Sequence, residues 1–462
     1  MVFPVVGGDG KPTGYEISNS LRVGSGRKLS RTFTEVSAER KKHTISCWIK
    51  LCILDGENHM LIAIAGSNNA YIRINDDHMF RFRFYDSGDD QAMFQTNKFF
   101  RDVSAWYHIV FVYDSAQGTD TNRTKLYVNG EQITSFSSGT YSGGRFPDQN
   151  EESIIGNNAE HRIEGYSSGG EFYVADWYYI GNQALSPSDF GETNNNGVWV
   201  PKKYEGSFGS TNDTFLEFKQ TGTSTDASGI GADTSGEGNH MASTNLAATD
   251  VAVDTPTNNF CTWNPLIGRA AAYAVFKEGN LDADFTSGSV YWRATGSIGV
   301  TSGKWYAEIK CIDDGGNTDL KIGVEHASPD QTTIDGVHRV IQSWNGYKAS
   351  GGSAASFGDS YADGDIIGVL LDMDNGTIKF SKNGTMMASS ASAYTDLISA
   401  MPESGWAFFA YGYDNANVQA NFGNPPFSIS SGNADANGYG NFEYAVPSGY
   451  YALCTKNLAE YG

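Results

Sequence analysis

Apolar and polar side chains alternate at every second position through much of this chain. In Met79–Phe84, three phenylalanines fall on one face and two arginines on the other, and Ile45–Leu51 alternates in the same way. A period of two residues is that of a β-strand with one buried face. The polar residues Asn75–His78 separate two such strands, which predicts a hairpin with a four-residue loop.

Long helical patterns are missing from the sequence. The best helix start is at Ser186, which is suited to cap a helix whose first position is Pro187. We expect this helix to extend over one or two turns only.

One local design occurs in both halves of the chain. Trp106–Ser115 is an apolar strand that is followed by a polar loop and by Thr124–Ile133, and Gly364–Thr385 repeats the plan. Each copy contains an apolar strand, an acidic turn, a second strand, an Asn-Gly turn and a third strand. Two copies of one meander predict two related β-sandwiches in tandem.

Composition changes after Phe218. Residues 219–259 are rich in Gly, Ser, Thr, Asn and Asp, which predicts either a linker or an irregular segment that covers a domain. The predicted plan is an N-terminal arm at 1–14, a first sandwich at 15–218, a connector at 219–259, a second sandwich at 260–427 and a C-terminal extension at 428–462 that packs back on a domain.

The formal net charge of −21 argues against a nucleic-acid partner and against adsorption to an anionic membrane. The apolar run Ile366–Leu371 is far shorter than a membrane span, and the first residues lack the pattern of a signal peptide. Five cysteines without a C-x-x-C pair indicate reduced, buried thiols, and therefore assembly in a cytoplasm.

The acidic string that begins at Asp372 invites a calcium loop. Such a loop needs Asp or Asn at 376 and Glu at 383, whereas the chain has Gly376 and Asn383. The string therefore predicts a hairpin turn and no metal ligands, and no motif supports a structural calcium ion or another cofactor.

Catalytic motifs are equally weak. The G-x-S-x-G string at Gly165–Gly169 is followed by a strand, although a nucleophile elbow requires a helix there. Adjacent carboxylates on a strand point to opposite faces, so pairs such as Asp313-Asp314 do not form a glycosidase site by themselves. We expect no catalytic residues and no enzyme activity. A glycan-degrading enzyme stays as an alternative, because carboxylates from distant strands can converge.

Two long loops, rich in polar residues, carry candidate binding residues. Exposed aromatic side chains on the end loops of a sandwich are typical stacking groups for sugars or peptides, although they can equally pin the loop to the core. The candidates are Tyr141, Arg145, Asn157, Asn158 and His161 in the first half and His338, Trp344 and Tyr347 in the second.

The stretch Arg27–His43 is unusually basic for so acidic a protein. It is either a solvated strand rim or a docking patch for an acidic neighbouring subunit. Its six cations are Arg27, Lys28, Arg31, Arg40, Lys41 and Lys42.

The second half resembles a SPRY domain over roughly 285–427. The resemblance is carried by strings at Thr301–Lys310, Lys321–His326, Tyr361–Thr385 and Val418–Phe427, in the order that such domains use. It implies a bent two-sheet sandwich that binds partners through end loops and is not an enzyme.

The first half resembles the laminin-G-like class of concanavalin A-like lectins. The strings that carry this resemblance are Ser18–Val23, His43–Lys50, Trp106–Asp114, Lys125–Ile133 and Phe172–Phe190. No metal or sugar ligands carry over with it. The expected fold class is all-β, with two tandem concanavalin A-like jelly-roll sandwiches and very little helix.

The two halves together, with the phrases DTPTNNF (Asp254–Phe260) and ALCTKNL (Ala452–Leu458), resemble virion proteins of tailed bacteriophages. The chain departs slightly from them, with Trp263 in place of Leu. The resemblance implies a tail-fibre or receptor-binding protein in the virion, assembled in the host cytoplasm and presenting loops to a host-surface glycan or protein. Its other partners would be phage structural proteins and copies of itself, a trimer by analogy with phage fibres. Capsid decoration or a head-fibre protein is the alternative.

Overall fold

The computed structural model describes residues 14–52, 58–64, 70–86, 89–137, 146–165, 170–267, 274–285, 291–316, 320–327, 338–413 and 415–462. The described residues form two compact units, with the boundary between Thr257 and Asn258. Each unit is described by itself below.

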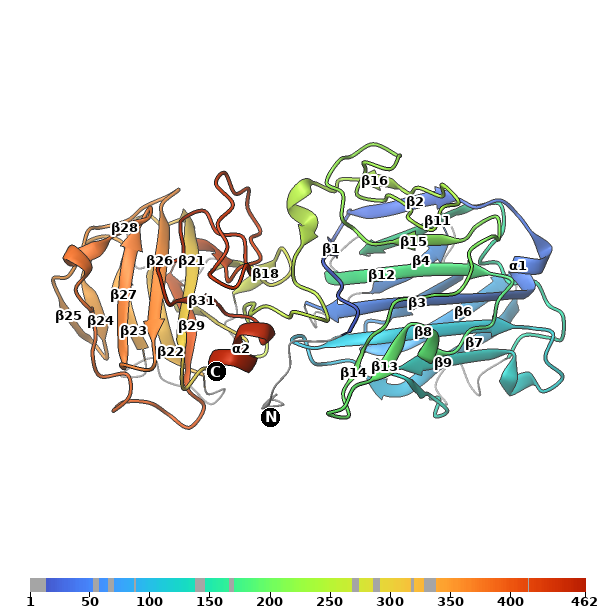
Figure 1. The fold of residues 1–462 in the computed structure, drawn as a ribbon, viewed down its shortest axis with the longest axis horizontal. Helices are drawn as coiled ribbons and strands as arrows, with labels where there is room; N and C mark the ends of the chain where they lie inside the picture. The colour runs from blue at the N-terminus through green and yellow to red at the C-terminus, as the bar shows by residue number, and fades with distance from the viewer. Residues whose placement is uncertain are drawn as a thin grey trace. The chain divides into compact units, whose positions relative to one another are not determined.

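The first unit is a sandwich of two antiparallel sheets (Figure 1). One sheet has the order β10-β9-β8-β3-β12-β1-β17, and β15 pairs with β12 off this path. Its strands are β1 (Ser20–Val23), β3 (Lys42–Leu51), β8 (Trp106–Asp114), β9 (Thr124–Val128), β10 (Glu131–Gln132), β12 (Phe172–Gly181), β15 (Thr214–Leu216) and β17 (Val251–Ala252).

The second sheet of this unit has the order β16-β2-β11-β4-β5-β6-β7. Its strands are β2 (Lys28–Thr32), β4 (His59–Ile64), β5 (Ala70–Ile74), β6 (Met79–Asp86), β7 (Asp89–Phe99), β11 (Glu160–Gly165) and β16 (Ala242–Thr244). A short hairpin of β13 (Gly191–Thr193) and β14 (Trp199–Pro201) stands apart from both sheets. Loop Asn75–His78 joins β5 to β6, so the predicted four-residue hairpin loop is confirmed.

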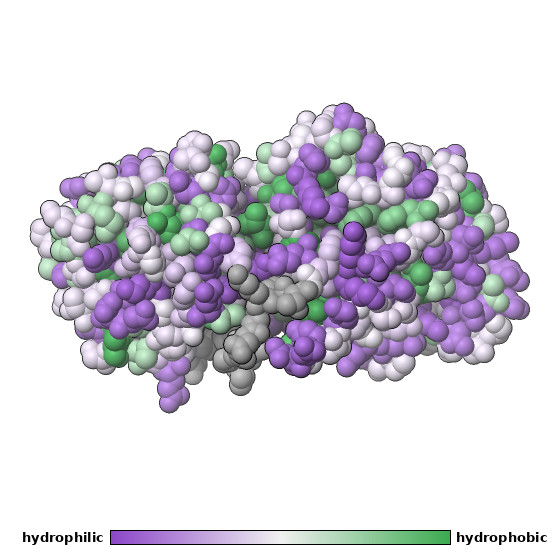
Figure 2. Space-filling view, viewed as in Figure 1, coloured by the Kyte–Doolittle hydropathy of each residue, from purple (hydrophilic) through white to green (hydrophobic). Residues whose placement is uncertain are grey.

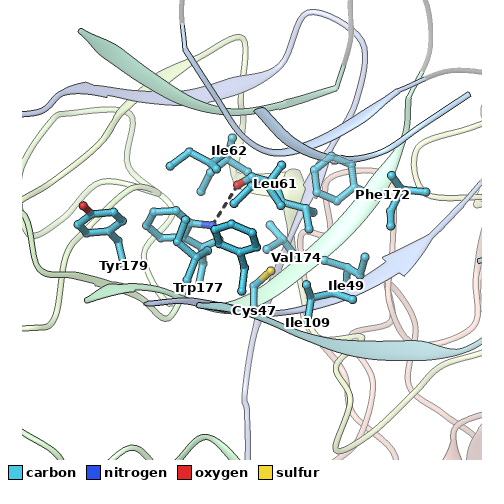
Figure 3. Close-up of a cluster of buried hydrophobic side chains, with 14 of the residues drawn as sticks. Cys47, Ile49, Leu61, Ile62, Ile109, Phe172, Val174, Trp177 and Tyr179 are labelled. Carbon is cyan, nitrogen blue, oxygen red and sulfur yellow. Dashed lines mark hydrogen bonds between the residues drawn. The ribbon is translucent and has the colours of Figure 1, made fainter. Parts of the chain in front are cut away.

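The core of the first unit lies between its two sheets, and the period-two pattern explains its composition. Cys47 and Ile49 of β3, with Trp177 of β12, point inward and pack against residues of the opposite sheet (Figure 3). The Trp177 indole N–H donates to the Leu61 carbonyl oxygen at 3.1 Å, which ties one sheet to the other through the core. An indole buried with a hydrogen-bond partner adds apolar area without an unsatisfied donor.

The second unit is also a sandwich of two sheets. One has the order β18-β19-β30-β21-β26-β27-β28, and β31 pairs in parallel with β21. Its strands are β18 (Val275–Lys277), β19 (Asp282–Asp284), β21 (Lys304–Asp313), β26 (Ile366–Asp372), β27 (Thr377–Lys382), β28 (Thr385–Met386), β30 (Asn417–Asn421) and β31 (Tyr451–Ala452).

The other sheet of the second unit has the order β20-β29-β22-β23-β24-β25. Its strands are β20 (Tyr291–Thr295), β22 (Lys321–His326), β23 (His338–Gln342), β24 (Lys348–Ser350), β25 (Ser353–Ala355) and β29 (Trp406–Tyr413). The fold class is therefore all-β with two jelly-roll sandwiches, as the sequence predicts.

The acidic string is a turn between β26 and β27. Asp372 accepts hydrogen bonds from the backbone and the side chain of Asn375, and Asp374 accepts one from the Gly303 N–H at 2.9 Å. These carboxylates shape the turn and fasten it to the neighbouring chain. Ile378 and Phe380 of the following strand are buried, as the alternation predicts.

Helices are short in the described residues. They are α1 (Ser37–Lys41), α2 (Thr455–Tyr461) and the 3-10 turns η1 (Asp120–Asn122), η2 (Pro187–Asp189), η3 (Ala248–Asp250) and η4 (Met387–Ser390). The predicted start at Ser186 is confirmed, because Ser186 and Asp189 form a capping box around the single turn η2. No helix among the described residues is long and apolar enough to span a membrane.

Residues 219–257 belong to the segment that the sequence predicts as either a linker or a covering of a domain, and they pack on the first unit. Its β16 pairs with β2, its β17 pairs with β1, and Asp233 bridges to Leu216. A second irregular segment, 428–462, packs on the second unit through β31, which pairs with β21, and through the buried Glu308, which accepts from the Tyr444 N–H; Asp435 accepts from the Ala452 N–H within the segment. Figure 2 shows that hydrophilic residues cover much of the visible surface, with apolar residues scattered among them.

All five cysteines are buried free thiols. Burial raises the pKa of Cys454 to about 12, so this thiol stays protonated and unreactive at neutral pH.

Candidate functional site

The turn between β23 and β24 presents two of the predicted binding residues. Trp344 is 40% exposed and Tyr347 is 38% exposed, whereas most large aromatic side chains of the second unit are buried. Both residues belong to one turn of five residues, Ser343–Tyr347, at one end of a sheet. Two aromatic side chains this close on an end loop can hold a flat or apolar ligand group between or beside them.

Hydrogen bonds fix the backbone of this turn. Asn345 Oδ1 accepts from the Tyr347 N–H at 2.8 Å, and the Gly346 N–H donates to the Gln342 carbonyl oxygen at 3.0 Å. Gly346 has a φ of 66° and lies so close to Gly358 that an added Cβ would stand 2.2 Å from the Gly358 carbonyl oxygen. Only glycine fits both requirements, so the close approach braces the turn from behind.

The Tyr361 side chain supports the same turn from the interior. Its phenolic oxygen lies 3.0 Å from the Leu320 carbonyl oxygen and 3.1 Å from that of Ile341, and the tyrosine itself is buried. The Ser343 N–H also donates to the Leu320 carbonyl oxygen at 2.9 Å. Trp344 and Tyr347 are thus held on a rigid support, which lowers the entropy cost of binding a ligand there.

A row of polar and aromatic side chains crosses one face of the sheet next to this turn, and Gln342, Tyr411 and Arg293 in it are buried. Gln342 of β23 lies opposite Lys321 of β22, which lies opposite Tyr411 of β29, which lies opposite Arg293 of β20. The Lys321 ammonium stands 5.2 Å from the centre of the Tyr411 ring. Gln342 is 6% exposed and its Oε1 is buried without a hydrogen-bond partner.

A buried ion pair lies farther along this face. Arg293 Nη2 lies 2.7 Å from Glu325 Oε2, and Thr295 Oγ1 donates to the same carboxylate. Burial raises the pKa of Glu325 to about 7, and the charge of Arg293 opposes this shift. The pair supports the sheet and positions Arg293, which contacts the Phe409 ring at 5.8 Å.

The structure corrects the sequence prediction for the two histidines. His161 is buried, stacks on Phe33 at 3.9 Å and accepts a hydrogen bond from the Gly156 N–H. His338 is 6% exposed and stacks on Phe409. Both histidines lie on strands, and each imidazole is covered by a stacked phenylalanine. Neither imidazole is therefore available as a surface ligand.

The other first-half candidates lie near one another in the chain but do not form a described site. Asn157 is half-buried and Asn158 exposed, in the turn before β11. Tyr141 and Arg145 lie outside the described residues.

Most cations of the basic stretch form ion pairs with acidic residues of the same chain. Arg27 pairs with Asp250, Lys28 with Glu160, Arg40 and Lys41 with Glu152, and Lys42 with Asp114, at 2.8–4.0 Å. Arg31 lies over the Phe33 ring at 5.2 Å and bonds to Asn212. These contacts favour the interpretation as a solvated strand rim. The docking patch for a neighbouring subunit stays a prediction.

One acidic group among the described residues has the geometry to hold a cation. Carboxylate oxygens of Asp313, Asp314 and Asp363 lie within 4.8 Å of one another. Hydrogen bonds from the loop itself account for these positions, since Asp363 accepts from the Asp314 N–H and Asp313 accepts from the Gly315 N–H. Asp363 is distant in the sequence from Asp313 and Asp314, so no local motif marks this cluster.

Comparison with known families separates the two units. A family model of the concanavalin A-like lectin/glucanases superfamily matches residues 28–189, and a model of the SPRY domain matches residues 304–425. The chain combines a concanavalin A-like domain with a SPRY domain. The description of the first family includes both lectins and glucanases, and each model covers a minority of the chain.

Ran-binding proteins are among the curated relatives of this chain. Ran-binding protein 9 of Danio rerio is 28% identical over 139 residues, which is 29% of this chain and 22% of that protein. Ran-binding protein 9 of Homo sapiens is 27% identical over 139 residues, 29% of this chain and 18% of that protein. The chain thus spans about a fifth of the length of these relatives. The resemblance to phage virion proteins stays a prediction beside them.

Solved structures of SPRY domains also match. The SPRY domain of human HERC1 is 20% identical, with 34% of this chain and 96% of that chain covered and a TM-score of 0.28. The PSpry domain of TRIM65 is 12% identical, with 35% and 92% covered and a TM-score of 0.28.

Proposed function

We propose that this chain is a non-enzymatic binding protein, which holds its ligand at the Trp344–Tyr347 turn of the SPRY-like unit. The observation that carries the proposal is the pair of exposed aromatic side chains on a braced turn, next to the buried, unpaired Oε1 of Gln342. Such a turn can recognise a sugar ring or a peptide side chain by stacking and by one or two directed hydrogen bonds.

We further propose that the protein belongs to a tailed-phage particle and contacts a host-surface glycan or protein there. Support comes from the two phrases on which the resemblance to phage virion proteins rests, because they fold against each other. Phe260 bridges to Cys454, the Cys261 N–H donates to the Leu453 carbonyl oxygen at 3.0 Å, and the Thr455 N–H donates to the Asn259 carbonyl oxygen at 2.9 Å.

This clasp gives a physical reason for the two phrases to occur together. Asn457 is fully buried and donates to Asp435 Oδ2 at 2.7 Å and to the Ala452 carbonyl oxygen at 2.8 Å. A buried amide that is paired in this way specifies one arrangement of the C-terminal segment. The location in a phage particle is proposed from the resemblance of these two phrases alone.

The experiment is to incubate the purified protein with the phage's host bacterium, wash the cells and measure retained protein. Retention that saturates with protein concentration is the expected result. No retention at concentrations well above micromolar would contradict an adhesive role and favour capsid decoration or a head fibre. Release of reducing ends from host polysaccharide would contradict the non-enzymatic assignment.

The location is tested separately. Antibody–gold labelling of intact particles is expected to mark tail fibres. Labelling of the capsid surface would point to decoration, and a chain missing from purified particles would refute the virion assignment.

A further inference from the structure

A lysine and an aspartate form an ion pair inside the first unit, shut off from water. Lys50 Nζ lies 2.7 Å from Asp254 Oδ2, and the two side chains are 1% and 0% exposed. Lys50 belongs to β3, and Asp254 follows β17 near the end of the unit, 204 residues further along the chain. Charged groups are rarely buried so completely, because each of them loses its hydration.

The strand register places Lys50 between two aromatic side chains on one face of its sheet. Trp106 of β8 lies opposite Lys50 on one side, and Tyr173 of β12 lies opposite it on the other. The Lys50 ammonium stands 5.6 Å from the centre of the Tyr173 ring. Both rings pack in one cluster with Ala252 of β17. The segment that contains β17 therefore closes over the lysine and excludes water from it.

Hydrogen bonds hold Asp254 in place beside the lysine. The Ser20 hydroxyl donates to the backbone carbonyl oxygen of Asp254 at 2.6 Å, and the Trp106 indole N–H donates to its Oδ1 at 3.2 Å. The two carboxylate oxygens have different neighbours, since Oδ2 accepts from the Lys50 ammonium. The carboxyl group is thus fixed in one orientation, with one oxygen toward the amine and the other toward the indole.

These contacts have the geometry for an amide bond between two side chains. Reacting atoms in a near-attack arrangement are about 3–3.5 Å apart, and a hydrogen bond of 2.7 Å to Oδ2 brings the amine close to this range of the carboxyl carbon, Cγ. Groups held in this way react as if present at about 10⁵ M or more. Transfer of one proton along the hydrogen bond gives a neutral amine beside a neutral acid, and burial lowers the cost of this transfer, because it disfavours charged groups.

We propose that Lys50 and Asp254 join in an intramolecular isopeptide bond once the first unit has folded. The bond that forms joins Lys50 Nζ to Asp254 Cγ, and the bond that breaks is the one between Cγ and Oδ2. Of the three protons on the ammonium, one stays on the amide nitrogen and two leave with Oδ2 as a water molecule. The step therefore needs no oxidant, reductant or cofactor.

Trp106 is the residue that assists this step. The negative charge of the tetrahedral intermediate develops on Oδ1, and the Trp106 N–H already donates to that oxygen. The same N–H donates to the carbonyl oxygen of the amide after the reaction. Because the amide is neutral, its formation also removes the cost of keeping two charges away from water.

The bond ties the end of the first unit to a central strand of its sheet. Asp254 lies three residues before Thr257, where the first unit ends. A pull on the second unit therefore reaches β3 through a covalent bond and does not peel β17 from β1. All five cysteines are free thiols, and an isopeptide bond reinforces the chain without oxidation. The inference goes beyond the proposed binding function and applies equally to a tail fibre, a head fibre or a decoration protein.

The test is the intact mass of the purified full chain, measured after denaturation. Wild type is expected to be lighter than its sequence by one water molecule, about 18 Da. A tryptic digest should contain a branched peptide in which Lys50 is joined to Asp254. The ion pair of Lys277 and Asp284 is the internal control, because its N–O distance is 3.1 Å but its side chains are 52% and 26% exposed. Lys277 should be found without a cross-link.

The decisive variant is Lys50→Arg, and its matched control is Lys277→Arg. The guanidinium of the first variant keeps the positive charge beside Asp254 but does not form this amide, so K50R should have its full sequence mass. K277R should lack one water molecule, as wild type does. Circular dichroism checks that K50R is folded, and if it is not, the branched peptide of wild type decides the question.

Folded wild type at its full sequence mass would overturn the proposal. A missing water molecule in K50R, or a digest in which Lys50 and Asp254 lie in separate peptides, would also overturn it. Either result would place the loss elsewhere, for example in cyclisation at an Asp-Gly sequence such as Asp363-Gly364. The readout is a mass, so a failure here is distinct from a failure of cell retention or particle labelling.

Discussion

Glu308 attaches the C-terminal extension to β21. It is fully buried on β21, and its carboxylate accepts four hydrogen bonds. The donors are the backbone N–H groups of Glu443 and Tyr444 at 2.9 and 2.7 Å, Asn421 Nδ2 at 3.1 Å and the Tyr306 hydroxyl at 3.2 Å. Two of the four donors belong to the extension itself, so the substitution Glu308→Ala removes its anchor.

The magnitude follows from these four bonds. Each donor left without an acceptor costs about 1 kcal/mol or more. Burial raises the pKa of Glu308, which means that burying the charge is itself unfavourable and that its removal returns part of the loss. We therefore expect Glu308→Ala to lower the free energy of unfolding of the second unit by about 3 kcal/mol, which for a unit of this size is roughly 6–12 °C in Tm.

Calorimetry and hydrogen exchange measure this prediction. The calorimetric transition of the second unit should shift, and the Glu443 and Tyr444 amides should lose protection from exchange. The matched control is Glu403→Ala, which removes the same side chain from an exposed position of the same unit and should change stability by less than about 0.5 kcal/mol. A Glu308→Ala shift no larger than that of the control would refute the anchoring role.

Two further predictions follow from buried or strained positions. Burial raises the pKa of Asp176 to about 7, so its stabilisation is present at acid pH and is lost as the pH rises through 7. The stability difference between wild type and Asp176→Asn should therefore fall by about 1.4 kcal/mol between pH 6 and pH 8, and a difference independent of pH in urea titrations would contradict this. Gly346→Ala should destabilise the aromatic turn by roughly 1–3 kcal/mol. The control Gly352→Ala should cost less, because Gly352 has a similar φ of 75° but an added Cβ there would meet nothing within 4 Å. Equal unfolding midpoints for the two variants would contradict the close contact at Gly346.

The strands could be predicted from the sequence because their alternation is a local property. The residues that face the core in β3 and β6 are those with period-two spacing, and the turns at Asn75–His78 and Asp372–Asn375 follow from their polar residues. The class of each sandwich also followed from short strings of residues. Turn residues and apolar alternation indicate the same structure in these segments, so their strands and turns could be predicted from the sequence.

The candidate site could be predicted only in part. A long polar loop with aromatic residues is visible in the sequence, and the structure shows Trp344 and Tyr347 of that loop exposed, while their role in binding stays a prediction. His161 and His338 were misjudged, because a histidine has no signature that distinguishes a buried, stacked ring from a surface ligand. The row of Gln342, Lys321 and Tyr411 was missed, since its members are adjacent only through the pairing of strands.

The most direct test of the proposed function compares three proteins in the host-cell retention assay: wild type, W344A/Y347A and I398A. Ile398 is 53% exposed on the same unit. The substitution I398A therefore removes an exposed apolar side chain away from the aromatic turn. Loss of a binding residue at the centre of an interface costs about 2 kcal/mol or more, so the double variant should bind about 30-fold more weakly or worse while I398A binds as wild type does. Retention of W344A/Y347A at the wild-type level, with its fold intact, would contradict the assignment of the aromatic turn as the binding site.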